Sequence, residues 1–238
     1  MLNQSFHPVH LAFSDKYDST HAEHYLRKHR AGLSRRLSHW RDVQMARQAL
    51  RMAGNPRQIL DLPCGAGRFW PVLLEDPACT LIGADNSPDM IAVARAAQAP
   101  ELLPRVRTLR TSAFAIDLPE QAVDSVFCMR LLHHIGDHEH RLTMLREFHR
   151  VTRETLIVSL WVDGNFKAMR RKRLERRRPR HAEPNRLVIP ARQIEREFAE
   201  AGFSIVGCSD FLPLYAMWRV YVLRKGPRPS EIGAGEAA

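Results

Sequence analysis

The sequence has few cysteines and no two of them close enough to form a metal knuckle. Cys64, Cys79, Cys128 and Cys208 are scattered along 238 residues without a CxxC spacing. This argues against a zinc knot and against a disulfide framework. No apolar run is long enough to span a membrane, and residues 1–18 lack the basic and apolar regions of a signal peptide. We therefore expect a cytoplasmic protein with reduced thiols and no bound metal.

Acidic residues are scarce in one stretch, and this local imbalance accounts for most of the net charge of +10. Residues 164–181 contain nine Lys and Arg against the single acid Glu175, which leaves the rest of the chain close to neutral. The basicity therefore belongs to one segment and not to the whole surface. The apolar fraction of 45% is ordinary for a protein with a packed core.

Apolar runs of strand length alternate with helical patterns from residue 56 onwards. This alternation predicts an α/β, Rossmann-like fold: a seven-stranded, mostly parallel sheet with helices on both faces. Only Pro213, Leu214 and Tyr215 join the last two strands, which is too short for a parallel crossover, so the last strand should be antiparallel. The expected strands are residues 58–62, 79–85, 105–111, 124–131, 154–162, 204–213 and 216–225.

Three regions follow from the composition. Residues 1–55 are expected to form an N-terminal helical cap, since Leu33, Leu37, Trp40, Met45, Gln48 and Ala49 recur at roughly helical spacing. Residues 56–226 are expected to form the core, with the basic insertion at about 163–190. Residues 227–238 are polar and small, which predicts a disordered tail. Helices are expected within residues 67–76, 87–99, 137–151 and 190–203 of the core.

The stretch ILDLPCGAGRFW, residues 59–70, leaves the first core strand through a glycine turn. A dinucleotide motif needs a small residue where Trp70 stands, and a Walker loop needs a Gly-Lys-Ser/Thr ending that is missing. Asp61 and Asp85 instead end two neighbouring strands, at the edge where open parallel sheets bind ligands. Two carboxylates there suit a ligand with a positive amino group and a ribose diol.

These segments resemble the class I S-adenosylmethionine-dependent methyltransferases, in particular the type 11 family, over roughly residues 56–160. ILDLPCGAGRF is similar to the first family motif, GADNSPDMIAVAR to the second-strand segment, and LPEQAVDSVFCMRLLHHI to the stretch leaving strand four. The resemblance implies S-adenosylmethionine as cofactor, with the methionine portion at Gly65 and Gly67 and the ribose at Asp85. The residues it implies for cofactor binding are Asp61, Pro63, Gly65, Gly67, Asp85, Asn86, Ser112, Ala113, Phe114 and Arg130.

Two positions depart from the family pattern, and a third residue, Arg130, has an alternative role. Pro63 stands where the family usually has a glycine, and it removes an N–H donor. Ser112 stands where an acid often accepts the adenine amino group. Arg130 would also suit an acidic group on the methyl acceptor, or an acid of the chain itself.

His133 and His134 follow strand four and are the candidate catalytic residues. Methyl transfer from a sulfonium is an in-line displacement, so the protein mainly aligns the reactants and excludes water. A base is needed only if the acceptor atom carries a proton. We favour acceptor orientation for these two histidines and leave the role of base open.

The basic insertion is the expected anion-binding element, through Arg170, Arg171, Lys172, Arg173 and Arg176. A small-molecule, lipid-linked or phosphoglycan acceptor would suit it, as would an anionic membrane surface, which would place the protein at the inner membrane face. RNA ranks lower because Phe166 is the only aromatic residue in the tract, and no DNA is expected. Two alternatives stay open: an RNA methyltransferase, or a degenerate cofactor-binding protein whose basic segment docks a partner. A solvated surface helix is the simplest explanation of the charge.

Overall fold

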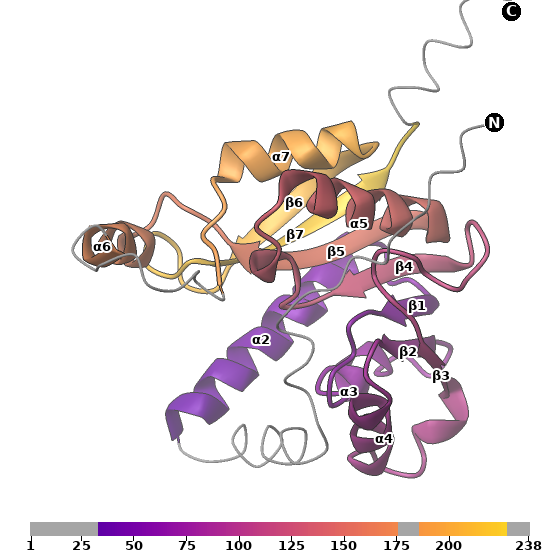
Figure 1. The fold of residues 1–238 in the computed structure, drawn as a ribbon. Helices are drawn as coiled ribbons and strands as arrows, with labels where there is room; N and C mark the ends of the chain where they lie inside the picture. Colours follow the sequence, from indigo (N-terminus) through magenta and orange to yellow (C-terminus); the bar gives the residue numbers. More distant parts are fainter. Residues whose placement is uncertain (1–32, 176–185, 228–238) are drawn as a thin grey trace, which may run out of the picture.

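A computed structural model describes residues 33–175 and 186–227 of the chain. Its centre is one seven-stranded sheet in the order β3-β2-β1-β4-β5-β7-β6 (Figure 1). All seven predicted strands are present. Their bounds are β1 Gln58–Asp61, β2 Thr80–Asp85, β3 Val106–Arg110, β4 Val123–Cys128, β5 Thr152–Trp161, β6 Phe203–Asp210 and β7 Trp218–Lys225.

The predicted sheet topology is confirmed. Strands β1 to β5 pair in parallel, whereas β7 is antiparallel to both β5 and β6. Strand β1 lies between β2 and β4, so the chain moves to one side of β1 and then to the other. The order of the sheet reverses here, and the carboxyl ends of β1, β2 and β4 open toward the same edge.

Helices cover both faces of the sheet, as Figure 1 shows. α2, α3 and α4 lie on one face, and α5 and α7 lie on the other. α6 stands apart, beyond one end of the sheet. The helices are α2 Leu33–Met52, α3 Trp70–Leu73, α4 Pro88–Ala96, α5 His138–Val151, α6 Phe166–Glu175 and α7 Ala191–Glu200, with short 3₁₀ turns at Leu103–Arg105 and Leu132–His134.

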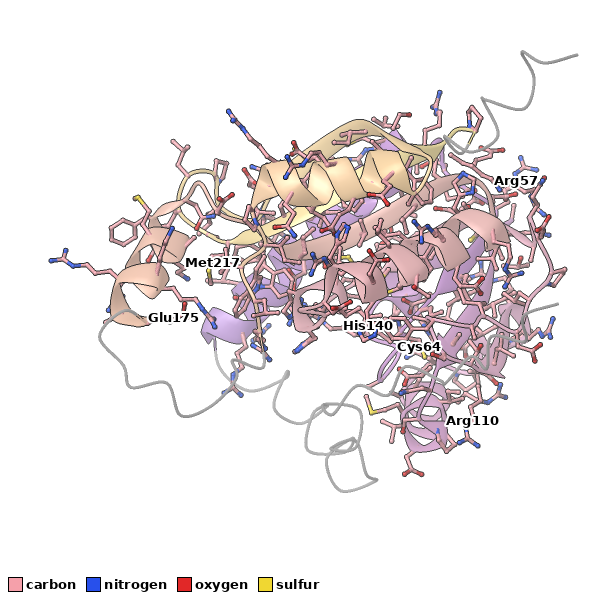
Figure 2. All side chains as sticks on the ribbon, turned by 45° about the horizontal axis from the view of Figure 1, so that its top comes forward. Arg57, Cys64, Arg110, His140, Glu175 and Met217 are labelled. Carbon is pink, nitrogen blue, oxygen red and sulfur yellow. The ribbon has the colours of Figure 1, made fainter. Side chains whose placement is uncertain are left out.

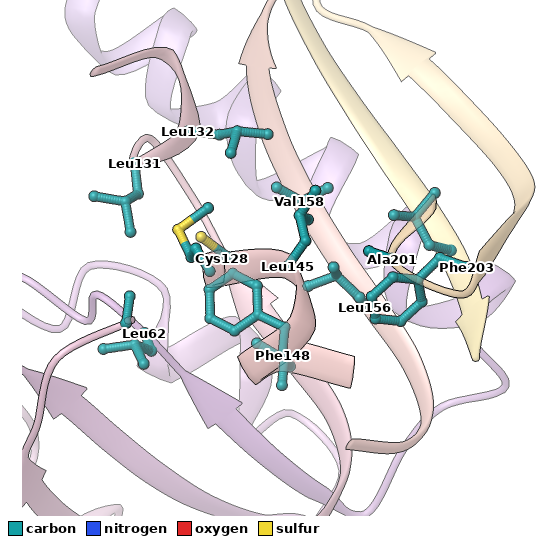
Figure 3. Packing of buried hydrophobic residues seen from close by; sticks show 14 of the residues in the cluster. Leu62, Cys128, Leu131, Leu132, Leu145, Phe148, Leu156, Val158, Ala201 and Phe203 are labelled. Carbon is teal, nitrogen blue, oxygen red and sulfur yellow. The ribbon is translucent and has the colours of Figure 1, made fainter. Parts of the chain in front are cut away.

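Each central strand contributes alternate residues to two separate cores, because successive strand side chains point to opposite faces. Ile59, Phe127 and Ile157 pack against α2 and α3. Leu60 faces the other way, into the core beneath α5 and α7. Figure 3 shows this second core, where Phe148 of α5 lies among strand residues of the sheet. The near-continuous apolar runs of the strands therefore reflect a sheet buried on both faces.

The helix predicted before residue 56 is present as α2, but its predicted apolar stripe is partly wrong. Met45 and Ala49 are buried against the sheet, as the spacing predicts. Leu37 and Trp40 are 65% and 59% exposed, because α2 runs beyond the sheet at its N-terminal end. The part of the predicted helical cap before residue 33 and the predicted tail after residue 227 lie outside the described residues. Within the described part, no helix is long and apolar enough to cross a bilayer.

A buried ion pair fixes the loop that follows β4. Arg141 of α5 donates two hydrogen bonds to Glu197 of α7, from Nε to Oε2 at 2.7 Å and from Nη2 to Oε1 at 2.6 Å. Its Nη1 also donates to the carbonyls of Ile135 and Gly136, at 3.0 and 2.7 Å. Burial alone would raise the pKa of Glu197, but the bonds from Arg141 and its other partners hold it below its usual range. Arg141 thereby holds the segment that carries the two candidate histidines.

We expect Glu197→Ala to lower the free energy of unfolding by about 3–5 kcal/mol, because it leaves the buried guanidinium without its counter-ion. Urea unfolding followed by circular dichroism at pH 7 measures this change. Glu200→Ala is the matched control, since Glu200 lies on the same helix as Glu197 but pairs with Arg146 of α5 on the exposed surface. Its loss should be about 0–1 kcal/mol. Equal losses in the two variants would show that the buried pair does not stabilise the fold.

Candidate functional site

The loop between β1 and α3 begins at the centre of the sheet. The backbone N–H of Leu62 donates to the Phe127 carbonyl of β4 at 3.0 Å, and that of Cys64 donates to the Ala84 carbonyl of β2 at 2.7 Å. The Leu62–Pro63 peptide is cis. The predicted glycine turn therefore lies over the point where the order of the sheet reverses.

Asp85 holds this loop from the end of β2. Its Oδ2 accepts a hydrogen bond from the Gly65 N–H at 3.0 Å, and its Oδ1 accepts one from the Ser87 N–H at 3.0 Å. The side chain is buried, which raises the pKa of its carboxyl, although these backbone N–H groups oppose the rise. Asn86 follows on the surface, and Ser87 caps α4 as predicted by accepting from the Met90 N–H at 3.3 Å.

Asp61 lies beneath the same loop and is almost completely buried. It accepts a hydrogen bond from Nε1 of Trp70 at 3.1 Å. Burial raises the pKa of its carboxyl well above the usual range, the Trp70 hydrogen bond opposes this, and the charge of Asp85 adds to it. The two predicted carboxylates therefore lie close enough to influence each other's ionisation.

Trp70 occupies space that Gly83 leaves free. A Cβ on Gly83 of β2 would lie 2.4 Å from the indole Cζ2. The residue that breaks the dinucleotide motif in the sequence is thus a buried donor to Asp61, and a glycine on the neighbouring strand makes room for it. This pairing of a tryptophan with a glycine thirteen residues away has no local sequence signal.

The two glycines of the turn have different surroundings, although both have a positive φ, of 52° at Gly65 and 68° at Gly67. A Cβ on Gly67 would lie 2.8 Å from Gln98 Nε2 and 3.2 Å from the Ala94 Cβ, so packing against α4 explains this glycine. A Cβ on Gly65 would meet only Met90 Cε within 4 Å, at 3.6 Å. Of the two, Gly65 is therefore the half-buried residue whose backbone a ligand could approach.

The segment after β3 lies beside Asp85. The Thr111 N–H donates to the Asp85 carbonyl at 3.0 Å, which brings the following turn to the same edge of the sheet. Ser112 Oγ accepts from the Phe114 N–H at 3.2 Å. Ser112 and Phe114 are half-buried, and Ala113 is buried. The structure thus brings the predicted adenine-side residues next to the predicted ribose-side acid.

Arg130 has an acid of the chain as its partner. It follows β4 with a positive φ of 66°, and its Nη2 contacts Asp42 Oδ2 of α2 at 2.6 Å. Arg68, directly after Gly67, donates to the same Asp42 oxygen and, from Nε, to His39 Nδ1 at 3.0 Å. Two guanidinium groups thus share one carboxylate. Arg68 Nη1 is buried and has no hydrogen-bond partner among the described residues.

We call His133, Trp161 and Trp218 the aromatic cluster. The His133 ring stacks on Trp161 at a centroid distance of 5.2 Å and meets Trp218 edge-on at 4.8 Å. Trp161 ends β5 and pairs with Trp218 at the start of β7. His133 Nδ1 and Trp161 Nε1 are buried without a hydrogen-bond partner in the described part of the chain. The half-buried His134 lies beside His133, at 4.2 Å between ring centroids.

Three arginines surround the aromatic cluster. The guanidinium carbons of Arg171 and Arg186 lie 5.2 and 5.6 Å from the Trp161 ring centroid, and that of Arg130 lies 5.1 Å from the Trp218 centroid. Burial, with the positive charges around it, lowers the pKa of His133 to about 2. His133 is therefore neutral at physiological pH and too weakly basic to take a proton from an acceptor.

The predicted anion-binding residues that the structure describes lie on different sides of α6. Arg171 is half-buried, and its Nη2 donates to the Arg186 carbonyl at 2.7 Å. Arg170, Lys172 and Arg173 are exposed on the other sides of α6. Arg176 lies outside the described residues. Of the predicted anion-binding residues that the structure describes, only Arg171 therefore contacts the aromatic cluster.

The sequence interpretation did not identify the two tryptophans of the cluster, Arg68 with its partners, or Arg186. The sequence did contain a signal for the two tryptophans, since the chain has four tryptophans and these two lie near the ends of predicted strands. The contacts of Arg68 and Arg130 with α2 had no such signal, because Asp42 is distant in sequence. Among the described residues, no group of three or more His, Cys, Asp or Glu could hold a metal ion.

A family model described as "Methyltransferase domain" matches residues 59–155, which contain Asp61, Asp85 and His133. Demethylmenaquinone methyltransferase of Thermus thermophilus is 36% identical over 114 residues, which are 46% of this chain and 51% of that protein. An uncharacterised methyltransferase-like protein of Schizosaccharomyces pombe is 31% identical over 93 residues, 39% of this chain and 33% of that one. The chain thus spans about half, and about a third, of these curated relatives.

Solved structures share the fold over more of the chain. Magnesium protoporphyrin IX methyltransferase from Synechocystis, with bound S-adenosylhomocysteine, superposes with a TM-score of 0.71 at 19% identity, over 89% of this chain and 97% of that one. The [4+2]-cyclase SpnF superposes with a TM-score of 0.59 at 17% identity, over 77% of this chain and 82% of that one. Residues 59–155 therefore match a methyltransferase domain, and the seven-stranded sheet has the fold of the class I S-adenosylmethionine-dependent methyltransferases.

Proposed function

We propose that this protein transfers a methyl group from S-adenosylmethionine to a small acceptor that carries an anionic group. The observation that supports this most is the pair of buried carboxylates, Asp61 and Asp85, around the glycine turn of a methyltransferase domain. The cofactor is that of the family. We infer the anionic group of the acceptor from the arginines around the aromatic cluster. This choice selects small anionic molecules among the small-molecule, lipid-linked and phosphoglycan acceptors considered from the sequence.

The residues at the edge of the sheet fit the cofactor. Asp85 would accept hydrogen bonds from the ribose hydroxyls, since each carboxylate oxygen can take a further donor beside its backbone N–H. The negative charge of Asp61 favours the positively charged end of the nucleoside. Arg68, with its unpartnered Nη1 and only a shared counter-ion, would bind the carboxylate of the methionine portion. When bound, the cofactor would supply a methyl group on a sulfonium, and the neutral thioether would depart without acid catalysis as the acceptor takes the methyl group.

The acceptor would lie against the aromatic cluster, because two polar atoms buried there have no hydrogen-bond partner among the described residues. An acceptor atom reaching His133 Nδ1 or Trp161 Nε1 would satisfy a group that the fold leaves unpaired. Arg130 lies between the proposed cofactor site and the aromatic cluster, since its guanidinium contacts both Asp42, which also binds Arg68, and Trp218. The surrounding guanidinium groups favour a carboxylate or phosphate on the acceptor.

His133 would orient the acceptor and exclude water, not remove its proton. Its pKa, lowered by burial to about 2, leaves no driving force for accepting a proton at neutral pH. The in-line displacement then depends on alignment, which the stacked rings and the Arg141-held loop provide. An acceptor atom that is already deprotonated, or that can react without losing a proton to the protein, meets this requirement.

A second function needs a test because the fold also occurs in the [4+2]-cyclase SpnF. A protein that binds the cofactor without methyl transfer would retain the glycine turn and lack an acceptor. Isotope-labelled S-adenosylmethionine incubated with a fractionated lysate separates the hypotheses. We expect label in an anionic small-molecule fraction. Label in RNA would support the nucleic-acid alternative, and cofactor binding by calorimetry without labelling of any fraction would support the degenerate one.

We expect Gly65→Ala to weaken S-adenosylmethionine binding by at least tenfold, because the new methyl group stands in the open approach to the loop. Gly54→Ala is the matched control, since Gly54 also has a positive φ, of 84°, and its Cβ would meet nothing within 4 Å. Both variants carry a backbone penalty of about 1–2 kcal/mol. Isothermal titration calorimetry measures the affinities, and equal affinities would place the cofactor elsewhere.

We expect Asp61→Asn to stabilise the cofactor-free protein at neutral pH and to weaken cofactor binding. The pKa of Asp61 is raised by folding, so its contribution to stability is complete below the ordinary carboxyl pKa and is lost as the pH rises through the raised value. Asparagine stays neutral and can still accept from Trp70. The variant should therefore gain stability relative to wild type between pH 5 and pH 8, by roughly 1 kcal/mol or more.

The same substitution should weaken binding by roughly tenfold or more, the scale of one charge-assisted hydrogen bond. Wild-type affinity should rise with pH as Asp61 ionises, and the variant should lose much of this dependence. Calorimetry between pH 5 and pH 8 tests both statements, with the exposed Asp89→Asn as control. A pH-independent wild-type affinity that the variant shares would contradict a role for Asp61.

We expect Arg186→Gln to reduce methyl transfer into the labelled fraction by roughly tenfold while leaving cofactor affinity unchanged, because the Arg186 guanidinium lies over Trp161 of the aromatic cluster. Arg192→Gln removes an exposed arginine from α7 and should change neither quantity. Initial rates with the purified labelled acceptor would separate a raised KM from a lowered kcat, and we expect the effect in KM. An unchanged rate would exclude Arg186 from acceptor binding.

A further inference from the structure

Helix α6 and the turn between β6 and β7 form a surface that combines exposed apolar and basic side chains. Figure 1 shows α6 beyond the end of the sheet, and Figure 2 shows its last residue, Glu175, at the end of the molecule opposite Arg57. We call this surface the α6 tip. It comprises Phe166, Lys167, Met169, Arg170 and Arg173 of α6 together with Leu212, Leu214 and Tyr215 of the turn.

Backbone and ring contacts join the two parts of the α6 tip into one surface. The Phe166 N–H donates to the Leu214 carbonyl at 2.9 Å, and the Lys167 N–H donates to the Tyr215 carbonyl at 3.1 Å. The rings of Phe166 and Tyr215 stack at 5.8 Å with an interplanar angle of 9°. The Lys167 ammonium lies 5.0 Å from the Tyr215 ring centroid. The turn therefore supports the first turn of the helix.

The side of α6 that faces outward carries both kinds of residue. Ala168 is buried and Arg171 turns toward Trp161, so these two residues mark the inner side. At 100° per residue, Phe166, Met169, Arg170 and Arg173 fall on the opposite side. Phe166 and Met169 are 51% and 64% exposed. A helix whose outer side contacts only solvent would carry polar residues on that side.

The turn adds further apolar area at the same place. Leu214 is 83% exposed, and Leu212 and Tyr215 are 48% and 46% exposed. Contiguous apolar area of this kind on a protein surface marks an interaction site. The only acid of α6, Glu175, accepts from Arg171 Nε at 2.7 Å, so no carboxylate of this helix neutralises the outward-facing arginines.

We propose that the α6 tip docks this protein onto an anionic lipid bilayer. Apolar side chains next to arginine and lysine match the boundary between acyl chains and acidic headgroups, where the former insert and the latter bind phosphate. Met169, Leu212 and Leu214 offer no aromatic face for stacking bases, and the rings of Phe166 and Tyr215 stack on each other, so the apolar part of the surface suits lipid better than RNA. The proposal is independent of the proposed function, because binding to vesicles needs no methyl transfer.

Docking through the α6 tip would bring the aromatic cluster close to the bilayer. Arg171 belongs to α6, and its guanidinium lies over Trp161 on the inner side of the helix. The same helix therefore faces the membrane on one side and the proposed acceptor site on the other. An acceptor that partitions into the membrane interface would reach the site across this helix.

Vesicle binding of the full chain tests the proposal. Sedimentation with vesicles of phosphatidylcholine and 30% phosphatidylglycerol is compared with pure phosphatidylcholine vesicles, at two salt concentrations. We expect binding to the anionic vesicles that weakens as salt screens the charges. Arg170→Gln with Arg173→Gln should weaken it by on the order of tenfold or more. Met169→Ser with Leu214→Ser should also weaken it, and should do so at both salt concentrations.

Matched variants distinguish the α6 tip from general surface properties. Arg192→Gln with Arg196→Gln removes two exposed arginines from α7, and Leu37→Ser removes an exposed leucine from α2. Both controls should bind vesicles as the wild type does. Absence of vesicle binding would overturn the proposal, as would equal losses in controls and test variants. Binding of an RNA homopolymer that the α6 variants abolish, without vesicle binding, would also overturn it and assign the surface to nucleic acid.

Discussion

The site depends on the hydrogen bonds that the Asp85 carboxylate accepts from Gly65 and Ser87. One side chain at the end of β2 thereby holds the β1–α3 loop and the start of α4 in a single arrangement. The bonds favour the charged form of a carboxyl that burial would otherwise neutralise. A hydrogen-bond acceptor is thus held at the edge of the sheet before any ligand arrives, and the backbone donors offset part of its desolvation cost.

Asp61 shows the same cost with less compensation. It lies deeper, receives one hydrogen bond from the Trp70 indole, and keeps a strongly raised pKa. A neutral residue there would stabilise the fold, so the acid is easiest to explain by a positive charge that the ligand brings. Gly83 belongs to the same arrangement, because the indole can reach Asp61 only where β2 carries no side chain. If Asp61 binds the cofactor as proposed, stability and binding make opposite demands at this position.

Predictions from sequence succeeded where local pattern decides the structure. All seven strands, the antiparallel last strand and the Ser87 cap follow from apolar periodicity, a short connection and a capping residue. The exposure of Leu37 and Trp40 did not follow, because spacing shows which residues share a helix face but not where the sheet beneath them ends. The aromatic cluster was also missed, since β5 and β7 bring Trp161 and Trp218 together across the sheet.

The roles of individual site residues depend on contacts that no motif encodes. Gly65 and Gly67 look equivalent in the sequence, yet only Gly67 is explained by packing within the chain. Arg130 contacts Asp42, on a helix outside the matched domain, and this acid also serves Arg68. Helix α2 therefore completes the charge arrangement of a site whose motifs all lie beyond it.

The basic segment is best understood as two surfaces on one helix. Arg171 and Glu175 pair on the inner side, and Arg171 also donates to the Arg186 carbonyl, so these contacts hold its guanidinium over Trp161. Arg170 and Arg173 lie one residue before and two after it and have the opposite orientation. A charge run that served solubility alone would need neither the inward contact with Trp161 nor the exposed Phe166 and Met169. Under the two proposals, the inner side of α6 would face the acceptor site through Arg171, and its outer side would face the membrane through Arg170 and Arg173.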